Sequence, residues 1–81
     1  MTHEDVLEHI RKTIATIATS KGLRPPKVDA DTMLLGGGLP IDSLDLASLV
    51  VELESFTGYD PFQAGFINFR TAGELARLYQ R

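Results

Sequence analysis

The stretch Gly36-Gly37-Gly38-Leu39-Pro40-Ile41-Asp42-Ser43-Leu44-Asp45 leads directly into an apolar-periodic segment over residues 46–56 of this 81-residue chain. Asp42 is a good helix N-cap, because its short carboxylate can accept hydrogen bonds from the unpaired N–H groups of the first turn. Asp45, three residues later, matches the second half of a capping box. Ser43 then occupies the first helical position, where the helix dipole and the free N–H groups favour an attached phosphate. The stretch therefore predicts a flexible Gly-rich loop that delivers one exposed serine to a helix start.

Asp42-Ser43-Leu44-Asp45, after a Gly-rich loop and before a helix rich in Leu, Val and Glu, resembles the prosthetic-group site of acyl carrier proteins. The resemblance covers nearly the whole chain. It implies that Ser43 carries 4'-phosphopantetheine through a phosphodiester, with Asp42 as the adjacent acidic residue. It also implies that the thiol of this arm holds an acyl, aminoacyl or polyketide group as a thioester. The alternative is that Ser43 is an ordinary first-turn residue between two capping carboxylates.

Composition restricts the other possibilities. A chain of 81 residues predicts one domain, residues 1–81, with room for one modest core. It contains no cysteine, so any thioester chemistry requires an added thiol. A formal charge of −3 argues against nucleic-acid binding. No apolar run approaches the ~20 residues of a membrane span, so we expect a cytoplasmic monomer.

Hydrophobic periodicity predicts an all-α fold. A first helix over residues 2–20 carries an apolar stripe, and a long loop over residues 23–41 follows. The central helix begins at Ser43 and ends near Thr57. Asp60 and Pro61 predict a short third helix, and a terminal helix follows Thr71. The expected architecture is a four-helix bundle like that of acyl carrier proteins. The apolar stripe of the first helix consists of Leu7, Ile10, Ile14 and Ile17. The residues expected to anchor the loop to the core are Val28, Met33, Leu34 and Leu35.

The central helix has two distinct apolar faces at 100° per residue. The first should enter the core and consists of Leu46, Leu49, Val50, Leu53 and Phe56. The second lies near Ser43 and consists of Leu44, Ala47, Ser48, Val51, Glu54 and Ser55. We expect this second face to dock partner enzymes rather than to remain a merely solvated surface. In the resembled family the corresponding face is usually richer in acid, so Ser48, Val51 and Ser55 favour dedicated partners with small apolar contacts.

The aromatic concentration of the chain follows the central helix and includes Phe62, Phe66 and Phe69. These rings either line an acyl pocket or simply close the core, and core packing is the preferred interpretation. His3 and His9 do not share a helix face, so they are interpreted as solvated and no metal site is expected.

The resemblance implies a discrete carrier in a polyketide or nonribosomal-peptide pathway. Its partners would be a phosphopantetheinyl transferase, an adenylate-forming acyl or aminoacyl ligase, and a ketosynthase, acyltransferase or condensation enzyme. The alternatives are an unmodified carrier-like interaction module and a housekeeping fatty-acid-synthesis carrier. An enzyme using Asp42 and Asp45 as an acid/base pair is disfavoured, because both are better explained as caps. No catalytic residue is therefore expected.

Overall fold

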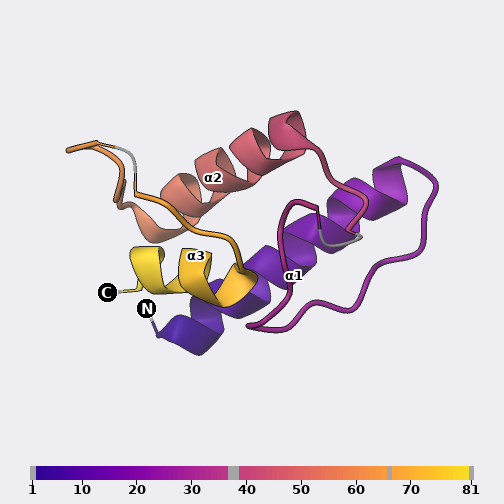
Figure 1. Cartoon of the computed structure of the whole chain (residues 1–81), viewed down its shortest axis with the longest axis horizontal. Coiled ribbons are helices and arrows are strands. Elements are labelled where there is room, and N and C mark those ends of the chain that lie inside the picture. Colours follow the sequence, from indigo (N-terminus) through magenta and orange to yellow (C-terminus); the bar gives the residue numbers. More distant parts are fainter. Residues whose placement is uncertain (1, 37–38, 66, 81) are drawn as a thin grey trace.

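The computed structural model describes residues 2–36, 39–65 and 67–80, and contains three helices there (Figure 1). They are α1 (His3–Ser20), α2 (Ser43–Thr57) and α3 (Ala72–Tyr79). Within these residues no strand forms, although Met33 and Thr71 make one isolated antiparallel bridge. The predicted all-α class is confirmed.

Helix α1 provides the central surface of the core. Thr2 caps it in a capping box with Asp5, and its buried face consists of Val6, Leu7, Ile10, Ile14 and Ala18. The predicted stripe is therefore correct, except that Ile17 is only half-buried. α1 contacts both other helices, whereas α2 and α3 contact each other little. In Figure 1, α2 lies along one side of α1, and α3 lies beside the N-terminal end of α1.

The core face of α2 agrees with the prediction at most positions. Leu49 and Leu53 are fully buried, and Leu46 and Val50 pack partly buried against the core. The prediction for Phe56 is wrong, because its side chain is 39% exposed. The ring stacks flat on an α1 side chain at the edge of the helix contact instead of entering the core.

That α1 side chain is His9, whose ring lies 3.9 Å from the Phe56 ring between centroids. His9 Nε2 is buried without a hydrogen-bond partner and lies 3.7 Å from a Glu52 carboxylate oxygen. His3 is also half-buried, with Nε2 at 3.1 Å from the Gly73 carbonyl oxygen. The interpretation of both histidines as solvated is therefore wrong, because each covers the edge of a helix contact.

The short third helix predicted at Pro61 is replaced by hydrogen-bonded turns at residues 61–64 and a bend at Gly65, and the described residues 59, 60 and 67–70 form neither helix nor turn. Asp60 Oδ1 accepts the Phe62 N–H at 2.9 Å, and the Gly65 N–H donates to the Phe62 carbonyl at 3.0 Å. Gly65 has φ +140, far from helical backbone. Few residues separate Pro61 from Gly65, so the cost of helix nucleation is not recovered by propagation.

The aromatic side chains of this region pack on one another. Phe62 lies 5.9 Å from Phe69 and 6.3 Å from the buried Tyr79 ring, measured between centroids. Burial raises the pKa of the Tyr79 hydroxyl, with further contributions from Glu54 and Asp60. Core packing therefore accounts for one side of Phe62 and Phe69. Phe66, also in this group, lies outside the described residues.

The segment between α1 and α2 has no helix in its described residues 21–36 and 39–42, and its middle is held against the start of α3. The Leu34 N–H donates to the Arg70 carbonyl at 2.9 Å. Val28 and Leu34 are buried as predicted, but Met33 and Leu35 are 40% and 42% exposed. Met33, Leu34 and Leu35 all line one surface pocket, described below.

A pair of leucines on α2 tests the assignment of its two faces. We expect Leu49→Ala to lower the free energy of unfolding by about 2–5 kcal/mol, because it opens a cavity in the core. Leu44→Ala is the matched control, since Leu44 is 78% exposed, and it should change stability by less than about 0.5 kcal/mol. Urea unfolding followed by circular dichroism measures both. Equal effects would contradict the assignment.

Gly73 lets the backbone of α3 approach the loop closely. A Cβ at this position would lie 2.7 Å from the Ala30 carbonyl oxygen and 2.9 Å from Ala30 Cβ. Gly73→Ala should therefore destabilise the protein by about 1–2 kcal/mol in urea unfolding, because overpacking outweighs the gain of about 1 kcal/mol in helix propensity. Adding Ala30→Gly should restore stability only in part, since the carbonyl contact remains. A Gly73→Ala variant as stable as the wild type would refute this account.

Candidate functional site

Ser43 is the first residue of α2, and it is exposed. Asp42 precedes it in extended backbone and caps the helix, with Asp42 Oδ1 accepting the Asp45 N–H at 2.9 Å. In return, Asp45 Oδ2 accepts the Asp42 N–H at 3.0 Å. The predicted helix start and capping box are therefore confirmed, and they hold the serine between two engaged carboxylates.

The chain that leads to Ser43 is held against the core by two apolar side chains. Leu39 and Ile41 pack partly buried against the core. Gly36 adopts φ +75, the left-handed conformation that favours glycine. The other two glycines of the predicted flexible loop, Gly37 and Gly38, lie outside the described residues.

One lysine dominates the electrostatics of the site. The Lys21 ammonium, at the end of α1, forms an ion pair with Asp45 Oδ2. This contact, followed by the hydrogen bond from the Asp42 N–H, lowers the pKa of the Asp45 carboxyl below its ordinary value. The Asp45 carboxylate, in the first turn of α2, is therefore kept ionised, and Lys21 offsets part of its negative charge.

The predicted docking face is largely open to solvent. Leu44 is 78% exposed and Val51 is 64% exposed, and Ala47 and Ser48 are also exposed. Glu54, the fifth predicted residue, is only half-buried. The face therefore offers apolar surface next to Ser43 with little charge.

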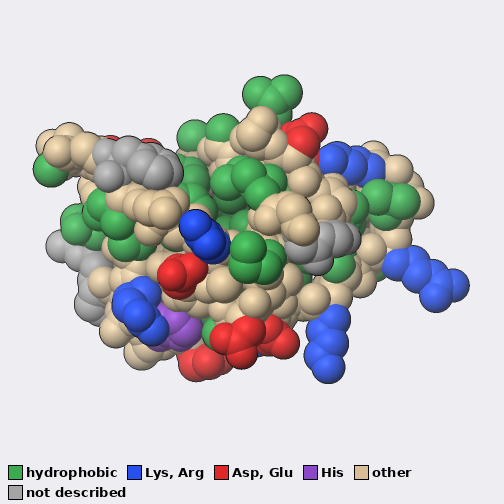
Figure 2. All heavy atoms as spheres, viewed as in Figure 1, with side chains coloured by type: hydrophobic (Ala, Val, Ile, Leu, Met, Phe, Trp, Pro, Cys, Tyr) green, Lys and Arg blue, Asp and Glu red, His purple; other side chains and the backbone are tan. Residues whose placement is uncertain are grey.

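An apolar groove of about 430 Å³ begins at Ser43 itself. One wall comes from α2 and the other from the two aromatic rings before α3; its lining residues are Ser43, Leu46, Ala47, Val50, Val51, Phe62 and Phe69. Figure 2 shows hydrophobic side chains exposed over the middle of this view, where Figure 1 places α2 and the segment before α3. Phe62 and Phe69 thus close the core with one side and line the groove with the other.

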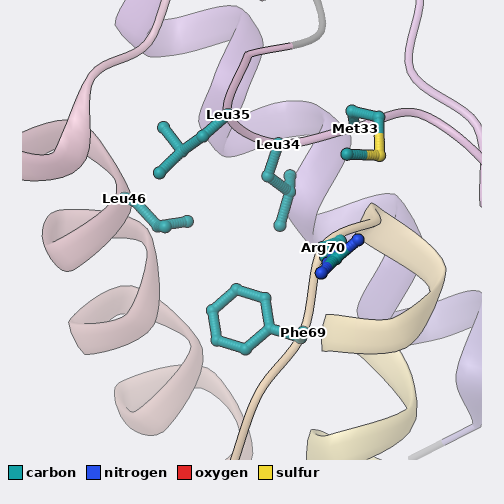
Figure 3. A pocket seen from close by; sticks show the side chains of 6 residues that line it. All are labelled: Met33, Leu34, Leu35, Leu46, Phe69 and Arg70. Carbon is teal, nitrogen blue, oxygen red and sulfur yellow. The ribbon is translucent and has the colours of Figure 1, made fainter.

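A second, smaller pocket of about 260 Å³ shares Leu46 and Phe69 with this groove. Leu46 and Phe69 point toward a common space bordered by Leu35 and Leu34 of the loop (Figure 3). Met33 and Arg70 complete the lining. The two hollows therefore adjoin through the same pair of side chains.

In the part of the chain that the structure describes, no three His, Asp or Glu side chains form a group that could hold a metal ion. Asp42 and Asp45 each accept a capping hydrogen bond, which accounts for both carboxylates of the suggested acid/base pair. No helix among these residues is long and apolar enough to cross a bilayer.

Comparison with protein-family models gives no match, and comparisons with curated proteins and with solved structures give none either. The position and surroundings of Ser43 are therefore the features that bear on function. Sequence reasoning missed Lys21, which is 24 residues from Asp45. Its only local signal was a cationic residue at a helix end. Leu46 was predicted only as a core residue, although it also lines both hollows.

The ion pair at Asp45 predicts a dependence of stability on acid pH. The pKa of Asp45 is depressed in the folded protein. The ionised carboxylate therefore contributes fully to the stability of the fold above the unfolded pKa of about 4. This contribution is lost as the pH falls through the lower folded pKa. We therefore expect the stability difference between the wild type and Asp45→Asn to shrink as the pH falls from about 5 to about 2.

Urea unfolding at a series of pH values measures this difference. Asp45→Ala is the control, because it removes both the charge and the oxygen that accepts the Asp42 N–H. It should be less stable than Asp45→Asn at every pH. A difference between the wild type and Asp45→Asn that does not vary with pH would contradict the lowered pKa.

Proposed function

We propose that this chain is a discrete carrier protein whose Ser43 hydroxyl accepts 4'-phosphopantetheine. The observation that supports the proposal most is the combination at one point of an exposed serine, a helix N-terminus and an apolar groove. An ordinary first-turn serine needs no groove beside it. The three helices of the described residues fit a carrier bundle, apart from the turn at residues 61–64, where carriers of this type have a third helix.

The residues around Ser43 suit an attached phosphodiester. The hydroxyl lies at the positive end of α2, where the first N–H groups lack intrahelical acceptors. The two flanking carboxylates would repel a phosphate, but Asp45 is paired with Lys21. The group itself would supply a thiol at the end of a flexible arm, and the chain has no cysteine of its own.

The exposed face of α2 would then be the docking address. Leu44, Ala47, Ser48 and Val51 are exposed on α2 within eight residues of Ser43, and Glu54 lies farther along the helix. A phosphopantetheinyl transferase would contact this face first. An adenylate-forming acyl or aminoacyl ligase and a ketosynthase, acyltransferase or condensation enzyme would follow, all in the cytoplasm. The scarcity of charge on this face favours dedicated partners of a polyketide or nonribosomal-peptide pathway over a housekeeping carrier.

Tethering explains why such a small domain would be useful. A substrate held on a flexible arm meets each docked enzyme at a raised effective concentration, without any catalytic group in the carrier. The domain contributes a stable attachment point and a recognisable surface. The proposed role therefore requires no active site in this chain.

The proposal is tested by incubating the purified protein with coenzyme A, magnesium and a broad-specificity phosphopantetheinyl transferase. Intact-protein mass spectrometry should show the addition of one phosphopantetheine group to the wild type. Ser43→Ala should abolish the shift, since it removes the attacking oxygen. Thr16→Ala is the control, because Thr16 carries an exposed hydroxyl on α1, outside the docking face, and it should be modified as the wild type is.

The outcomes separate the proposal from its main alternative. An unchanged mass of the wild type would contradict the carrier function and support an unmodified interaction module. A shift that persists in Ser43→Ala would move the attachment to another residue.

A further inference from the structure

Lys21 makes two contacts that connect the end of α1 to the site at Ser43. Its ammonium pairs with Asp45 Oδ2 and donates to the Pro40 carbonyl oxygen at 3.0 Å. Pro40 lies three residues before Ser43, and Asp45 lies two residues after it. One cation thus holds the chain on both sides of the serine.

These contacts converge on the capping box. Asp45 Oδ2, the oxygen that pairs with Lys21, also accepts the Asp42 N–H. Asp42 in turn accepts the Asp45 N–H, so the three side chains form one connected network around Ser43. A displacement of Lys21 would therefore also displace the backbone immediately before the serine.

The backbone of Lys21 is itself well fixed. Lys21 is the C-cap of α1, and its N–H donates to the Ile17 and Ala18 carbonyls at 3.2 and 3.1 Å. The Leu23 N–H also donates to the Ala18 carbonyl at 2.9 Å, and Ala18 is buried in the core. The ammonium therefore extends from an anchored helix end to the turn before α2.

We propose that Lys21 is a positioning residue for modification of Ser43, which holds the turn at residues 40–45 in the conformation that the modifying enzyme recognises. This inference rests on the proposed carrier function. Lys21 acts in two ways: it restricts the backbone on both sides of the serine, and it offsets the charge of Asp45 where an anionic phosphate donor must approach. It does not touch the reacting atoms.

Transferase kinetics on a set of variants test the inference. Lys21→Met keeps much of the aliphatic stem but removes the charge, and we expect kcat/KM for modification to fall about three- to tenfold, as expected for losing a modest ion pair and some backbone order. Lys21→Arg should restore most of the rate. Lys27→Met is the matched control, because Lys27 is an exposed lysine of the same loop, and it should be modified at the wild-type rate.

A double-mutant cycle shows whether Lys21 acts through Asp45. The double variant Lys21→Met/Asp45→Asn should be modified no more slowly than the slower single variant, since both substitutions remove the same ion pair.

Nuclear magnetic resonance provides a readout that general destabilisation would not change. In Lys21→Met the titration midpoint of the Asp45 carboxyl should rise, and the Ser43 and Leu44 amides should exchange faster, while amides in the middle of α1 stay protected.

The possible failures are distinguishable. A wild-type protein that the transferase does not modify refutes the carrier function and this inference with it. A modified wild type, with Lys21→Met modified equally fast, overturns only the role of Lys21. Equal slowing of Lys21→Met and Lys27→Met also overturns it, because the effect would then reflect net charge.

Discussion

Burial of the apolar stripe of α1 is the interaction on which the rest of the structure depends. Val6, Ile10 and Ile14 are fully buried, and each such side chain contributes about 1.5–3 kcal/mol when removed from water. α2 and α3 contact each other little, so both are positioned chiefly by packing on α1. Since a domain of this size has a small core, the direction of α2, and with it the place of Ser43, is set by this one surface.

The connection between α1 and α2 is fixed at two places, which together restrict the chain before Ser43. Its middle approaches the start of α3 so closely that only glycine fits at position 73, where the N–H donates to the Ala30 carbonyl at 2.8 Å. Its two ends are joined by Lys21, which reaches from the end of α1 to Pro40 and Asp45. This connection, which has no helix or strand in its described residues 21–36 and 39–42, is thus held by contacts with the elements on either side of it.

Local signals in the sequence predicted the starts of α2 and α3, because a capping box needs only residues three apart. Asp42 with Asp45 and Thr71 with Glu74 form capping boxes as expected. The local signal of Asp60 and Pro61 was wrong, since only turns follow it. The other errors arose where tertiary contacts decide. Phe56 has the periodicity of a core residue but stacks on His9 at the edge of α1. The pair of Lys21 and Asp45 joins residues 24 positions apart, and no spacing rule in the sequence could have indicated it.

The two faces of α2 differ in what they contribute to the core. Leu49 and Leu53 contribute to the core, whereas Leu44 and Val51 are largely exposed and contribute little to it. Their apolar surface is costly in water unless another molecule covers it. The half-buried residues between the two faces, Leu46 and Val50, belong to both, since they pack on the core and also line the groove that begins at Ser43. A molecule that covered the groove would therefore contact the edge of the core directly, and binding there would stabilise the fold as well as the complex.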